Sequence, residues 1–392
     1  EGLIDVAGGA ARILNDVGDV IVNEVDVSSD ANKTIRATVL DIETNSIGTT
    51  TTPLNVELVR NSSVTTDVLI DASGDVDLTL TGRYREGTAP STRPVFQASL
   101  IEADGDVTIG LLPTQQDGVL PSIDPENDSS DTFATPGVAF TDSSNSDSDG
   151  TYHKRFSTDP GNASDLDLLT YADASQATEI SGKFAFDLLK ASGNIVVFSN
   201  DSANSVMDVT ANTDGSETGY LDFLTDGELN VTETDGDLRI QKIESSGDDV
   251  SLTSTRGSIF DVNDDLFNDV GIDPGNNNTA WVIGNNITLR ATSPGETIGK
   301  LSDLLEIDSA NSMGGQLDAI ADSGVHLMET DGDLTLKGVA SNASDVLLVV
   351  SDGWLLDGGA TSDNGIDKVD IQGANIDLLT PKGGIGSATN DV

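Results

Sequence analysis

The sequence predicts an all-β chain of many short strands joined by turns. Short runs in which apolar and polar residues alternate recur at a spacing of roughly ten residues, as strands do in all-β folds. The turn-forming residues between them are abundant, with 40 Gly and 11 Pro. No long segment keeps the helical period of about 3.6 residues. This pattern fits either a parallel β-solenoid or a series of antiparallel β-sandwich modules.

The repeating element is a turn followed by a strand, and its clearest example is Glu-Thr-Asp-Gly-Asp-Leu-Thr-Leu at residues 329–336. A near copy, Glu-Thr-Asp-Gly-Asp-Leu-Arg-Ile, occupies residues 233–240. Asp-Gly-Asp supplies a glycine that tolerates positive φ and side-chain oxygens that accept hydrogen bonds from nearby backbone N–H groups. The motif therefore predicts a structural unit and not an active site.

The similarity extends well beyond the motif. Residues 233–261 align with residues 329–357 without a gap, with twelve identities in 29 positions. Inward positions change only to other apolar residues, as in Ile240 against Leu336 and Ile243 against Val339. A retained packing register of this kind predicts a structural repeat of about 96 residues.

Three segments are expected along the chain. Residues 1–110 and 166–392 keep the strand rhythm, and the stretch 183–191 is predicted to be a strand. Residues 111–165 form a loop-rich insertion or linker, because five prolines interrupt them and residues 141–150 are almost all Ser, Asp and Asn. A closing motif at Ile385-Gly386 lacks the strand that follows its earlier copies, which predicts a longer chain or a strand from a neighbour.

The charge of the chain excludes whole classes of partner. Asp and Glu number 67 against 19 Lys and Arg, a formal net charge of −48, so nucleic acid and anionic lipid are repelled. No apolar run approaches the roughly 18 residues of a membrane span, so no membrane insertion is expected. Cysteine is absent, which excludes disulfides and thiolate metal sites. With 4% aromatic residues, the core must be aliphatic.

Several phrases resemble the repeats of filamentous-haemagglutinin-type adhesins and other very large bacterial surface proteins. They are Gly-Asp-Asp-Val-Ser-Leu-Thr-Ser at residues 247–254, Arg-Gly-Ser-Ile-Phe-Asp at 256–261, and Asn-Ile-Thr-Leu-Arg-Ala-Thr at 286–292. The resemblance covers residues 225–392 better than residues 1–110. It implies a right-handed parallel β-helix whose function is adhesion or an extracellular filament, located outside the cell or on its surface.

One loop has the spacing of a calcium site. Asn145, Asp147, Asp149 and Thr151 place oxygen ligands at alternate positions, with Gly150 at the position of the sharp turn. The position of the bidentate Glu is taken by Phe156, and Asp142 or Asp159 is the candidate replacement. No cofactor is required, and Ca²⁺ binding is weighed here against a solvated acidic loop.

Catalysis has little support in the sequence, and no enzymatic activity is expected. The two histidines, His153 and His326, stand in no motif, and nucleophile-elbow, P-loop and dinucleotide fingerprints are absent. Arg83, Tyr84 and Arg93 are expected in salt bridges and loop anchors, with anionic glycan contact as the alternative.

The expected function is a structural or adhesive segment of a bacterial surface or filament protein. Its partners are expected to be further copies joined end to end, the continuation of a longer chain, or a host or matrix glycan or protein. Two alternatives remain open at this point: a carbohydrate-active β-helix, acting as a polysaccharide lyase or depolymerase, and a sandwich adhesin made rigid by Ca²⁺.

Overall fold

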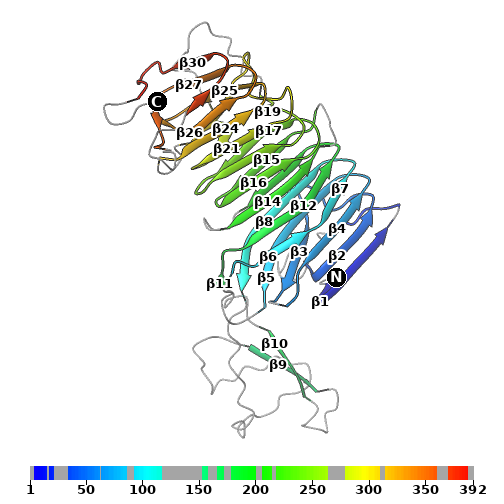
Figure 1. The fold of residues 1–392 in the computed structure, drawn as a ribbon. Coiled ribbons are helices and arrows are strands. Elements are labelled where there is room, and N and C mark those ends of the chain that lie inside the picture. The colour runs from blue at the N-terminus through cyan, green and yellow to red at the C-terminus, as the bar shows by residue number, and fades with distance from the viewer. Residues whose placement is uncertain are drawn as a thin grey trace.

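The computed structural model is an elongated stack of β-strands that runs from the N-terminal strands to the C-terminal ones (Figure 1). The residues that the structure describes are 4–15, 17–21, 34–61, 63–85, 92–116, 152–157, 166–171, 178–199, 205–213, 218–263, 279–309, 314–359 and 370–386. These residues contain no helix, so none could cross a membrane as one.

Most strands belong to two stacks, in which each strand pairs with a strand one coil further on. The first coils contain β1 (Ile4–Asn15), β2 (Thr34–Thr44), β3 (Leu54–Arg60), β4 (Asp67–Ala72), β5 (Val76–Tyr84), β6 (Val95–Ala98) and β7 (Leu100–Ala103). The first half of β2 pairs with β3 and its second half with β4, so β2 contributes to both stacks.

Stack 1 begins with β4, β6 and β7, and further strands extend it by pairing toward the C-terminus. They are β12 (Lys183–Ala191), β14 (Val206–Asn212), β16 (Glu228–Glu233), β18 (Val250–Ser254), β21 (Ile287–Ala291), β24 (Gln316–Ala321), β26 (Leu334–Ser341), β28 (Leu355–Asp357) and β29 (Ile371–Gln372). The prediction of a strand at residues 183–191 is confirmed by β12.

Stack 2 begins with β3 and β5, and further strands extend it by pairing toward the C-terminus. They are β8 (Val107–Gln116), β13 (Ile195–Ser199), β15 (Leu221–Thr225), β17 (Leu238–Ser245), β19 (Ile259–Asp261), β20 (Val282–Ile283), β22 (Thr297–Ile298), β23 (Leu305–Asp308), β25 (Gly324–Glu329), β27 (Val346–Val350) and β30 (Ile376–Leu379).

The pairing within both stacks is parallel, and this decides between the two fold classes that the strand rhythm allowed. Among the named strands of the large sheet, only β11 (Thr178–Glu179) pairs antiparallel, with the end of β8. Sandwich modules would require antiparallel pairing throughout. The predicted all-β parallel solenoid is therefore confirmed, and the alternative of tandem sandwiches is wrong for this chain.

The core consists of columns of apolar side chains along the axis of the stack. One column runs through Ile42, Ile70, Ile101 and Leu189, which are register partners in successive coils and are at most 1% exposed. Each strand alternates inward and outward residues, so every coil adds one aliphatic layer to the column. Burial of these layers is the main stabilising contribution, at roughly 25 cal/mol per Å² of apolar surface.

The long connection in the chain lies between β8 and β11, before the chain returns to the stacks at β12 and β13. Val107 pairs with Ile195, a separation of 88 residues, whereas Val76 pairs with Val107 over 31 residues. Within this connection, β9 (Tyr152–Ser157) and β10 (Leu166–Tyr171) form a separate two-stranded antiparallel sheet. The expected segment boundaries thus differ from the strands: β8 continues to Gln116, and the strand at 166–171 is not part of the solenoid.

The 96-residue repeat is present in the structure, but strands that match between its two copies belong to different stacks. We call this the exchange of stacks. Strands β16 to β19 match β25 to β28 in order, and each start and end is shifted by 96 residues. Their pairings match as well, since Leu238 pairs with Ile259 and Leu334 with Leu355. Yet β16 belongs to stack 1 and β25 to stack 2. The two copies of the motif therefore close corners on different edges of the coil.

Candidate functional site: the repeated glutamate corner

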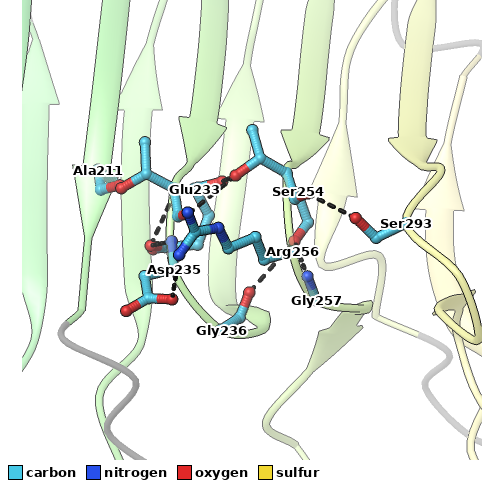
Figure 2. A network of polar contacts seen from close by, with 10 residues as sticks. Ala211, Glu233, Asp235, Gly236, Ser254, Arg256, Gly257 and Ser293 are labelled. Carbon is cyan, nitrogen blue, oxygen red and sulfur yellow. Dashed lines mark hydrogen bonds and ion pairs between the residues drawn. The ribbon is translucent and has the colours of Figure 1, made fainter.

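The first copy of the motif forms the corner after β16, with Glu233 at its start (Figure 2). Glu233 is 0% exposed, because it occupies an inward position at the end of its strand. Its Oε1 accepts hydrogen bonds from the backbone N–H of Thr234 at 3.0 Å and of Asp235 at 3.2 Å. Gly236 then turns the chain with φ of 83°, a conformation that favours glycine. The predicted turn chemistry is thereby confirmed, with a buried glutamate as its unexpected acceptor.

Side chains of the next coil fasten this corner. Ser254, the register partner of Glu233, donates its Oγ–H to the carbonyl of Gly236 at 3.2 Å and accepts the N–H of Gly257 at 3.0 Å. Arg256 reaches back toward the first corner, as Figure 2 shows, and its Nη1 lies 3.5 Å from Oδ1 of Asp235. The contacts of Ser254 with Gly236 and of Arg256 with Asp235 thus tie the corner after β16 to the corner after β18.

The second copy places Glu329 in an equally buried position at the end of β25, again 0% exposed. Its donors differ from those of Glu233 and come from the preceding coil. The backbone N–H of Ser309 lies 3.1 Å from Oε1, and its Oγ lies 2.6 Å from Oε2. Gly332 repeats the positive φ of its counterpart, at 77°. The corner is preserved while its hydrogen-bond donors are exchanged.

Burial governs the protonation of both carboxyl groups. It raises the pKa of Glu233 to about 7, against opposing hydrogen bonds from the backbone of Asp235, Thr213 and Thr234 and from the Thr213 hydroxyl. Burial also raises the pKa of Glu329 well above its usual range. Hydrogen bonds from Ser309 oppose that shift, and the nearby charges of Asp308 and Asp331 add to it. Both groups are suited to hold a proton near neutral pH.

A second set of acidic side chains connects successive coils along the axis. The Asp75 carboxylate accepts the N–H of Asp106 at 3.0 Å, and the Asp106 carboxylate accepts the N–H of Asn194 at 2.7 Å. Asp237 and its repeat partner Asp333 do the same for Ser258 and Trp354, at 2.8 and 2.7 Å. These aspartates therefore cap the next coil, and much of the acidity in the turns is structural.

The predicted calcium ligands lie outside the described residues. This applies to Asn145, Asp147, Asp149, Thr151 and Asp142, so the calcium loop stays a prediction. Within the part of the chain that the structure describes, no group of three or more His, Asp or Glu side chains is arranged to hold a metal ion.

Other singled-out residues have structural surroundings. Arg83 lies 3.7 Å from the Glu57 carboxylate, which also pairs with Arg36 at 2.8 Å. Arg93 donates to the Ser181 hydroxyl at 2.9 Å. The prediction that such arginines form salt bridges and loop anchors is confirmed for these two.

His326 is half-buried on β25, and burial lowers its pKa. Trp354 is 47% exposed, and its ring lies against Gly384 of the next coil.

The burial of Glu233 and Glu329 differs from the exposed turn that the motif predicts. A signal was available, because Glu233 and Glu329 follow Val231 and Leu327 at the two-residue spacing that marks the inward face of a strand. Glutamate is seldom buried without a partner, so residue type alone points to an exposed side chain here.

Comparisons with known proteins identify no relative. No family model, no curated protein and no solved structure matches this chain.

Proposed function

We propose that the chain is an extracellular structural and adhesive segment of a large bacterial surface or filament-forming protein. Its role in this proposal is mechanical and not catalytic: it is a stiff rod that spans distance and presents loops along its length. The resemblance of residues 247–261 and 286–292 to repeats of such proteins motivates the location at the cell surface.

The observation that carries the proposal is the axial bonding of the solenoid. Parallel backbone pairing links each coil to the next from β1 to β30, across the long connection as well. Side chains add to these links, for example where the Asp249 carboxylate accepts two hydrogen bonds from Asn286. In such quasi-one-dimensional stacking each coil contacts its neighbours along the axis, and this continuous pairing supports the proposal of a stiff rod.

End-to-end association is part of the same proposal. The outermost described strands leave core-column positions uncovered, with Ile4 45% exposed at one end and Ile376 and Ile385 43% and 48% exposed at the other. Ile376 continues the column of Val346, which is 1% exposed one coil earlier. Two copies joined by these ends would pair in parallel and bury both surfaces, and the contact would not close on itself.

Sedimentation velocity and electron microscopy over a concentration series test this association. The expected result is a series of longer particles of unchanged width, lost in an Ile376→Asp/Ile385→Asp variant. Phe198→Asp is the matched control, because Phe198 is 44% exposed on the side of the rod. A monomer at all concentrations, or equal loss in the control, would contradict end-to-end assembly.

Location is tested separately with antibodies raised against the chain. Labelling of intact cells of the source organism is expected, and labelling only after lysis would contradict an extracellular role. A panel of glycans and matrix proteins, immobilised on a surface, then tests adhesion. Cleavage of a polysaccharide in that panel would favour the carbohydrate-active alternative over the mechanical role.

A further inference from the structure

The two buried glutamates lack the positive partner that a buried carboxylate normally has. Glu233 and Glu329 are both 0% exposed. Among the residues that the structure describes, no Lys or Arg forms an ion pair with either one. Their hydrogen-bond partners are backbone N–H groups and hydroxyl groups. A buried charge without a counter-ion is costly, so the neutral, protonated form is the favoured one.

The charged groups around Glu233 do not reverse its preference for the protonated form. Asp235 and Asp237 lie in its own corner, and Arg256 lies in the corner after β18. Arg256 is directed at Asp235, to which its guanidinium lies at 3.5 Å (Figure 2). The register partners on β14 and β18 are Ala211 and Ser254, which carry no charge.

The surroundings of Glu329 are acidic throughout. Its own corner contains Asp331 and Asp333, and the preceding β23 contains Glu306 and Asp308. The residue paired with it on β27 is Val350, and Asp352 follows two positions later. Nearby negative charge disfavours a further carboxylate, so these neighbours also favour the protonated form.

We propose that the corners at Glu233 and Glu329 are two proton-binding sites that fasten the coils when occupied and loosen when the surroundings become alkaline. Loss of the proton leaves a carboxylate inside the coil, which can be hydrated only if the corner opens. The opening would start at the corner contacts with Ser254 and Ser309, because these are the contacts with the neighbouring coil. The device does not depend on where in the cell the rod is located.

The hydrogen-bond donors of the two sites differ. Glu233 receives several backbone N–H groups, which stabilise its ionised form, and burial still raises its pKa to about 7. Glu329 receives the backbone N–H of Ser309 at 3.1 Å and the Ser309 hydroxyl at 2.6 Å, and burial still raises its pKa well above the usual range.

Infrared difference spectroscopy of the full chain, with ¹³C-labelled glutamate carboxyl groups, tests proton occupancy directly. At about pH 7, where ordinary carboxylates with pKa near 4 are ionised, the wild type is expected to show a protonated-carboxyl band that shifts with the label. Glu233→Gln and Glu329→Gln should each remove one component of this band. Asp377→Asn, an exposed change on β30, should leave both unchanged. No such band, or a band unaffected by either glutamine, would overturn the proposal.

Hydrogen exchange tests the coupling to the corners. After correction for the intrinsic pH dependence of exchange, amide N–H groups of residues 234–237 and 254–257 should exchange faster at about pH 8 than at about pH 6 in the wild type. Glu233→Gln should abolish this difference while circular dichroism confirms the fold. An equal pH response in wild type and variant would refute the coupling, even if the protonated band is present.

Discussion

Asn286 lies one coil beyond Asp249 and donates two hydrogen bonds to the same carboxylate oxygen, from its backbone N–H at 3.0 Å and from Nδ2 at 2.9 Å. The repeat copies this relationship at Asp345 and Asn375, with 3.1 and 2.7 Å. A carboxylate that serves two donors in the next coil acts as an axial clip between coils.

Asp249→Ala should therefore destabilise the rod, by roughly 1–3 kcal/mol for the loss of hydrogen bonds to a charged group. Asp249→Asn keeps an acceptor oxygen and should cost less. Urea denaturation followed by circular dichroism measures both. Equal stability of Asp249→Ala and wild type would show that water replaces the clip without cost.

Stability should decline as the pH rises through the neutral range. An acid whose pKa is raised in the folded state stabilises the fold fully below its unfolded pKa and loses that contribution as the pH rises through the folded value. For Glu233 the window runs from 4.5 to about 7, and the loss is on the order of 3 kcal/mol. Melting temperatures across this window should fall less steeply for Glu233→Gln than for wild type. Parallel slopes would count against a buried, titrating glutamate.

Gly353 is a site where the stacking distance itself forbids a side chain. A Cβ at this position would lie 1.9 Å from the carbonyl oxygen of Gly332 in the preceding coil, and a Cβ at Gly383 would lie 1.8 Å from the carbonyl oxygen of Gly353. Gly353→Ala should force the corners apart and lower the melting temperature strongly. Gly338→Ala is the control, because nothing lies within 4 Å of its Cβ position. Similar effects of the two substitutions would mean that the corners can separate freely.

The core and the outer face should respond differently to removal of a phenyl ring. Phe223 is 0% exposed on β15, whereas Phe198 on β13 is 44% exposed. Phe223→Ala should cost about 3–5 kcal/mol, the usual range for a cavity of this size. Phe198→Ala should cost much less, as measured by the same denaturation curves. A comparable loss at Phe198 would indicate that its ring is covered in solution.

Much of the fold follows from the sequence, because alternating apolar and polar residues mark the inward and outward positions of a strand. The runs around Val250 and Val346 show the inward positions, and the shared glycines at 257 and 353 show where neighbouring coils approach. The stack to which each copy of the repeat belongs does not follow from the sequence. The same corner motif closes either edge of the coil, and the lengths of the coils between the two copies determine which edge it closes. The buried glutamates could not be foreseen from propensity, because their donors, such as Ser309 for Glu329, come from another coil.

The exchange of stacks also determines what the repeat can display. Asp235 and Asp331 are equivalent by sequence, yet their corners follow strands of different stacks. A fluorophore or ligand attached at each position would therefore decorate two edges of the rod and not one row. Since the chain lacks cysteine, a single cysteine at either position would address one edge alone. One repeated sequence therefore presents the same turn on two edges of the solenoid.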